Sequence, residues 1–156
     1  MRVRTLAVAV VAVVVALASP AFAQNPVGVW KANIAKSKYS PGPAPKSVTI
    51  TTTAVAGGSF KTVNETVPAT GATAKTEVTF KFDGRDNKMT GSPNADTQSY
   101  TRVDDRHWTV VSKKAGKVTM TSKIELAADG KTRTTTQTGT DAQGHAATNL
   151  IVYEKQ

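Results

Sequence analysis

The chain has 156 residues, no cysteine, and 20 Lys and Arg residues against 11 Asp and Glu, which gives a formal net charge of +9. This length suits one domain, and the lack of cysteine excludes a disulfide framework, a Cys-ligated metal and a thiol nucleophile. The basic residues are scattered along the chain with acidic residues among them. The charge therefore indicates a solvated surface, and we expect no specific nucleic-acid partner.

The first 23 residues have the three parts of a secretory signal peptide. Two arginines precede the 13-residue apolar run Leu6–Ala18, and Ala21 and Ala23 then place small residues at the two positions that a signal peptidase reads. This pattern predicts cleavage between Ala23 and Gln24. The run is shorter than the roughly 17–25 residues that span a bilayer, so no transmembrane anchor is expected after cleavage. The mature chain, 24–156, is expected to be a single β-barrel domain of 133 residues with a charge of +7. An exported protein without cysteine suits a bacterial periplasm or secretion from a bacterium.

The mature sequence alternates between apolar and polar residues, with Gly, Asp and Pro at intervals of roughly 8–12 residues. No window outside the leader shows sustained helical periodicity. The segment 35–47 carries prolines at positions 41, 43 and 45 and is expected to form an extended loop across one end of the fold. The expected strands are 27–34, 48–54, 60–67, 75–82, 88–90, 98–103, 107–112, 117–126, 131–140 and 147–153.

The first and last strands are expected to pair, because joining the two ends removes the exposed edges of a sheet. Threonine supplies 24 residues, including the runs 51–53 and 134–136, where the two faces of a strand are barely distinguishable. Such strands bury little apolar area and suit a barrel with a partly polar interior better than a sandwich. The alternative is that they are edge or solvent-facing strands. The sequence thus predicts an all-β, up-and-down antiparallel barrel of about 8–10 strands.

Gly28-Val29-Trp30, followed by this β pattern, resembles the start of calycin proteins, the superfamily of lipocalins and fatty-acid-binding proteins. The ending Val152-Tyr153-Glu154-Lys155 is similar to the last strand of fatty-acid-binding proteins. The run 30–47 and Lys81-Phe82-Asp83-Gly84 resemble small exported bacterial proteins of unknown function. These resemblances imply a lipocalin-like barrel and bring no activity with them.

Two departures from the fatty-acid-binding pattern concern the site. That family inserts two helices between its first strands, where this chain has the proline-rich segment 35–47. It also holds the fatty-acid carboxylate partly with an Arg-x-Tyr in the last strand, and the matching positions here read Ile151-Val152-Tyr153. Lipocalins often stack an Arg from a late strand over the Gly-x-Trp indole. By chain position, the resemblance points to Arg133 for this contact, with Arg102 second.

Tyr100 and Arg102 share one face of their expected strand, close in sequence to Trp108. If that face points inward, Arg102 needs an anion, because a buried lone charge is costly. The alternative, that Ser99, Thr101 and Val103 face inward, stays open. The candidate ligand-binding residues are Trp30, Phe80, Tyr100, Arg102, Trp108, Arg133 and Tyr153.

The sequence contains no catalytic or metal-ligating motif and implies no cofactor. His107 and His145 lack metal-ligand spacing, and Asp104-Asp105 is typical of a turn. We therefore expect a monomeric exported protein that binds a small apolar or anionic amphipathic molecule in its barrel. The alternative is a structural or interaction protein of the cell envelope with a filled barrel, and an enzyme on the same scaffold ranks third.

Overall fold

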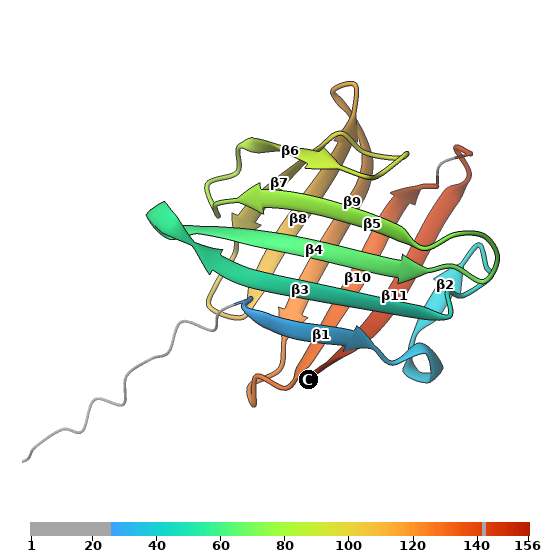
Figure 1. Cartoon of the computed structure of the whole chain (residues 1–156), viewed down its shortest axis with the longest axis horizontal. Coiled ribbons are helices and arrows are strands. Elements are labelled where there is room, and N and C mark those ends of the chain that lie inside the picture. The colour runs from blue at the N-terminus through green and yellow to red at the C-terminus, as the bar shows by residue number, and fades with distance from the viewer. Residues whose placement is uncertain (1–25, 142) are drawn as a thin grey trace, which may run out of the picture.

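The computed structural model describes residues 26–141 and 143–156, so the expected leader and its cleavage between Ala23 and Gln24 lie outside the described residues. Within these residues one antiparallel sheet closes on itself into a barrel (Figure 1). The strand order is β1-β3-β4-β5-β6-β7-β8-β9-β10-β11, and β1 pairs with β11 to close the wall. The lipocalin-like, up-and-down barrel expected from the sequence is confirmed, with ten strands in its wall.

The strands agree with the expected segments to within a few residues, and β9 agrees at both ends. Two short 3-10 turns, η1 and η2, complete the described secondary structure. The bounds are β1 Gly28–Ala32, η1 Ile34–Lys36, β2 Lys38–Ser40, β3 Ser47–Val55, η2 Ala56–Gly58, β4 Ser59–Val67, β5 Ala74–Phe80, β6 Asp86–Thr90, β7 Thr97–Arg102, β8 His107–Lys114, β9 Lys117–Leu126, β10 Thr132–Thr140 and β11 Ala146–Lys155.

The prediction of a single loop over 35–47 is wrong in its first part. Lys38–Ser40 forms β2, which pairs with β11 beyond β1, so β1 and β2 occupy the same edge of β11 in succession. The extended conformation that the prolines favour is also the conformation of a strand, and three residues before Pro41 use it to pair. Residues 41–46 then connect β2 to β3, mostly exposed to solvent.

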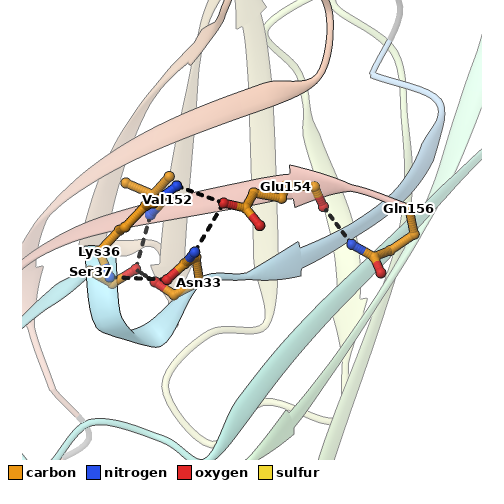
Figure 2. Close-up of polar contacts among 6 residues, drawn as sticks. All are labelled: Asn33, Lys36, Ser37, Val152, Glu154 and Gln156. Atoms are coloured by element: carbon orange, nitrogen blue, oxygen red, sulfur yellow. Dashed lines mark hydrogen bonds and ion pairs between the residues drawn. The ribbon is translucent and has the colours of Figure 1, made fainter.

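A polar clamp of Asn33, Lys36, Ser37 and Glu154 fastens the turn between β1 and β2 to β11 (Figure 2). The Ser37 hydroxyl donates to the Asn33 carbonyl at 2.7 Å and accepts from the Val152 amide at 3.0 Å. The Asn33 side chain and the Lys36 ammonium both donate to Glu154 Oε1, at 2.9 and 3.0 Å. The turn therefore interrupts the strand without leaving these backbone groups unpaired, and the barrel stays closed at its seam.

Burial alternates along most strands of the wall, for example β3, β8 and β10, as a closed barrel requires, whereas β4 is half-buried along nearly its whole length. Trp30 is fully buried, and around it lie the other large apolar side chains of the core. Val118, two residues before Met120 in β9, does not join the core, since it is 60% exposed. It pairs with Lys113 at the irregular start of the hairpin, next to the turn and away from the core.

The wall is weakest between β5 and β6. These strands share two register pairs, whereas β4 and β5 share seven. Figure 1 shows β6 as a short strand on the rim of the barrel.

Among the described residues, no helix has the length and hydrophobicity needed to cross a membrane.

Candidate ligand-binding site

The barrel interior holds a partly open cavity of about 120 Å³. Ligand sites in proteins are usually about 300–1,000 Å³, while an engineered apolar cavity of about 150 Å³ holds benzene. The space therefore suits a molecule of roughly benzene size. Its lining is half polar and comprises Pro26, Ile50, Thr52, Thr62, Asn64, Thr76, Val78, Phe80, Met89, Gln98, Tyr100, Trp108, Val110, Ser122, Ile124, Arg133, Thr135, Gln137 and Tyr153.

Arg133 is the charged residue of this lining. It is the second residue of β10 and lies opposite Tyr153 of β11 in the register. The side chain is buried, with 7% of the residue exposed, and no carboxylate of the described residues forms an ion pair with it. Its Nε atom has no hydrogen-bond partner. The barrel thus holds a cation inside, with hydrogen-bonding capacity to spare.

Aromatic rings compensate this charge in part. The guanidinium carbon of Arg133 lies 4.6 Å from the centre of the Tyr153 ring and 5.6 Å from that of Trp30. Each such contact contributes about 0.5–2 kcal/mol, while burying an ion costs several kcal/mol. Burial accordingly lowers the pKa of the Arg133 guanidinium, and the Tyr153 and Tyr100 hydroxyls act in the opposite direction. The rings alone leave the charge undercompensated, which makes the site receptive to an anion.

Two buried phenols lie near the guanidinium and remain protonated at neutral pH. Burial raises the pKa of Tyr153 to about 12, against the opposing effect of Arg133. Burial also raises the pKa of Tyr100. The Tyr100 ring stacks on Phe80 with 3.5 Å between the ring centres, and its hydroxyl donates to Gln98 Oε1 at 2.8 Å. The neutral Tyr153 hydroxyl beside the cation is suited to hydrogen-bond an anionic oxygen, whereas the Tyr100 proton is already donated to Gln98.

Much of the polar lining satisfies itself. Gln98 Nε2 donates to the Ser112 hydroxyl at 3.0 Å, which extends the chain that begins at Tyr100. The hydroxyls of Thr52 and Thr62 share a hydrogen bond of 2.9 Å. Gln137 donates to Ser122 at 3.4 Å and accepts from Asn149 at 3.1 Å. The Thr135 hydroxyl differs from these groups because it is buried without a hydrogen-bond partner.

The apolar side of the cavity is aromatic. Phe80 and Trp108 line it directly, and Phe60 and Phe82 pack behind Phe80 with ring centres 5.6 and 5.4 Å away. Trp30 does not line the cavity. Its indole N–H donates to the Pro26 carbonyl at 3.0 Å, and its ring lies behind Arg133.

Four further candidates from the sequence, Phe80, Tyr100, Trp108 and Tyr153, line the cavity with Arg133. Arg102, the remaining candidate on the Tyr100 strand, is not among the residues that line the cavity. Tyr100 does face inward, but Arg102 ends β7 at the rim, where its guanidinium carbon lies 4.3 Å from the centre of the Phe82 ring. The Phe82 ring in turn packs against Phe80, Tyr100 and Trp108, which line the cavity.

Sequence reasoning missed the polar residues of the lining, notably Thr135, Gln137 and Gln98. Thr135 and Gln137 follow Arg133 at alternate positions of one strand, so Arg133 itself was the signal that could have placed them.

The two histidines lie outside the cavity. His107 Nδ1 contacts the Asp104 carboxylate at 2.8 Å, and His145 Nδ1 contacts Asp141 at 3.1 Å. In both cases the same carboxylate accepts backbone N–H groups of its own turn. Asp104 thus has the turn role expected from the sequence. In the part of the chain that the structure describes, no three acidic or histidine side chains gather as metal ligands.

One comparison with known proteins bears on the fold, the comparison with solved structures. No family model matches the chain, and no curated protein matches it. Among solved structures, the wild-type fluorescent protein UnaG is similar, with a TM-score of 0.57 and 18% sequence identity over 83% of this chain and 96% of that one. At that identity the likeness shows the fold alone. The fold and the cavity define a closed, lipocalin-like barrel with a buried cation inside.

Proposed function

We propose that this protein binds a small anionic molecule inside its barrel, with the anionic group on Arg133 and Tyr153 and the rest against Phe80, Tyr100 and Trp108. The observation that carries the proposal is a buried guanidinium that lines a cavity. No carboxylate of the described residues pairs with it, and its Nε atom has no hydrogen-bond partner. A carboxylate there would supply the missing counter-charge, and hydrogen bonds between charged groups are the strong ones.

The register supports this assignment. The Arg of an Arg-x-Tyr pair is absent at Ile151, but Arg133 faces Tyr153 directly across the β10–β11 ladder. The cation and the phenol are thus brought together by strand pairing rather than by spacing within one strand. The cavity of about 120 Å³ favours a short or single-ring acid over a long-chain fatty acid.

Titration with benzoate, followed by NMR or calorimetry, tests the proposal on the mature chain. Arg133→Met should weaken benzoate binding about 10- to 100-fold, because it removes a charged hydrogen-bond donor. Arg102→Met is the matched control and should leave affinity unchanged, since Arg102 packs on Phe82 outside the cavity. Benzyl alcohol, which lacks the charge, should bind both variants and the parent protein alike. Equal benzoate affinity in the parent protein and the Arg133 variant would contradict the proposal.

The size of the cavity favours a second candidate, a cell-envelope structural or interaction protein whose barrel interior is filled. Native mass spectrometry of protein purified from its own cell compartment separates the two. Ligand binding predicts a retained mass that Arg133→Met removes. A filled barrel predicts the bare mass for both proteins and no response to any small acid.

We also propose that the protein is exported, works as a monomer and binds rather than catalyses. The support for export is the three-part leader that ends at Ala23. Sequencing the amino terminus of protein from a periplasmic fraction should give Gln24, and retention of the leader in the cytoplasm would contradict export. Size-exclusion chromatography with light scattering measures the mass of the protein in solution. A mass of two or more chains would contradict a monomer.

A further inference from the structure

Two buried side-chain atoms at the cavity, Arg133 Nε and Thr135 Oγ1, have no hydrogen-bond partner. Arg133 is 7% exposed and Thr135 is 4% exposed. They occupy successive inward positions of β10, so their Cα atoms are about 6–7 Å apart. Two unsatisfied polar atoms on one strand, both at the same cavity, define a surface for a ligand with two polar groups.

The Thr135 hydroxyl is the unusual member of the pair. A buried hydroxyl without a partner is unfavourable, and a valine would occupy the same space without that penalty. Other hydroxyls and amides of the lining form hydrogen bonds with one another, as in the Thr52–Thr62 and Gln137–Ser122 pairs. Thr135 lies opposite Ile151 and Ile124, whose side chains offer no acceptor.

We propose that Thr135 determines specificity at this site, and that the ligand is a small hydroxy acid whose carboxylate binds Arg133 while its hydroxyl, on the α- or β-carbon, binds Thr135. The inference rests on the proposed function and deepens it. One strand repeat separates the two protein groups, so the two ligand groups must be close neighbours on a short molecule. A fatty acid offers only the first of them.

Matched acid pairs test this inference on the mature protein. Lactate with propionate, and mandelate with phenylacetate, differ within each pair by one α-hydroxyl. The protein should bind the hydroxy acid about 3- to 10-fold more tightly than its partner, the range expected of one neutral hydrogen bond. Thr135→Val keeps the shape and removes the hydroxyl, so it should reduce the ratio of the two affinities within each pair to about one. Thr135→Ser should retain the preference.

Thr134→Val is the control on the same strand, because Thr134 lies on the other face of β10 and does not line the cavity. Thr135→Val should also melt no lower than the parent protein, which keeps loss of folding apart from loss of specificity. Equal binding of both acids of each pair by the parent protein would overturn the inference. So would a hydroxyl preference that survives in Thr135→Val.

The two proposals fail in different ways. If no acid binds, or if Arg133→Met binds all four acids as the parent does, the proposed function is wrong. If both acids of a pair bind equally and both need Arg133, the anion site stands and only the role of Thr135 is wrong. A water molecule shared by Arg133 and Thr135 gives that second result.

Discussion

The buried guanidinium should make the ligand-free protein less stable than it could be. Arg133→Met replaces the charge with an apolar side chain of related shape at a position where no carboxylate of the described residues lies within ion-pair distance. The removed cost is the desolvation of one ion, several kcal/mol. The lost benefits are the contacts to the Trp30 and Tyr153 rings, about 0.5–2 kcal/mol each, and some packing volume worth about 1 kcal/mol.

The balance favours the variant. Replacing buried charged groups with apolar residues is neutral or stabilising by about 1–4 kcal/mol in other proteins. Because the ring contacts are lost here, the expected gain in the free energy of unfolding is in the lower part of that range, about 1–2 kcal/mol. For a domain of this size each kcal/mol shifts Tm by about 3–5 °C. Urea denaturation at pH 7 measures the free energy of unfolding, and calorimetry measures Tm.

Arg102→Met is again the control, because Arg102 is half-buried at the rim and should change stability by less than about 1 kcal/mol. If Arg133→Met instead lowers the free energy of unfolding by more than about 1 kcal/mol, the guanidinium stabilises the ligand-free barrel. Its burial would then need no ligand to explain it, and the reasoning behind the anion site would fail. A gain in stability together with loss of benzoate binding is the combination expected of a residue kept for function.

Three further predictions concern the barrel itself. Because the pKa of Tyr153 is about 12 in the folded protein and near 10 when unfolded, the unfolded chain loses its proton first, so stability should fall by about 2–3 kcal/mol as pH rises from 10 to 12; denaturation at several pH values measures this loss, and Tyr153→Phe should reduce it. Ser37→Ala removes the hydroxyl that bridges Asn33 and Val152 and should cost about 1–2 kcal/mol in urea denaturation, and no loss would mean that the clamp contributes nothing to closure. Gly139→Ala should cost about 2 kcal/mol or more, because a Cβ at this position would lie 2.1 Å from the carbonyl oxygen of Thr119; Thr138→Ala, on the other face, should cost less, and equal losses would contradict the close approach of β10 to β9.

The sequence was sufficient for the fold because alternation is a local signal, and an up-and-down sheet leaves only its first and last strands with edges to pair. Trp30 and Tyr153 mark the first and last strands, and these strands do pair, with Ala32 opposite Tyr153. The aromatic candidates also proved to face inward, since large apolar side chains decide the face of the strand that carries them. β2 was missed because the prolines that follow it dominate the local pattern, although Tyr39 and its neighbours are free to pair.

The site was predicted less well, for a reason that lies in β10. Its inward face carries Arg133, Thr135, Gln137 and Gly139, and its outward face carries only threonines. No apolar residue distinguishes the two faces, so hydrophobic patterning cannot place Arg133 inside. Only the ladder with β11 sets Arg133 opposite Tyr153, and that pairing depends on the length of the intervening turn.

The close approach of β10 to β9 supplies the specificity that hydrophobicity lacks. Gly139 pairs with Met120, and a side chain there would collide with the Thr119 carbonyl and the Met120 Cα, 2.1 and 2.7 Å away. A slip of β10 by one residue would bring a threonine to that position and would exchange the faces of the whole strand. Because Arg133 lies six residues before Gly139, it shares the same face. The glycine thus disfavours the cheaper arrangement with threonines inside, and keeps a cation where burial alone would not put it.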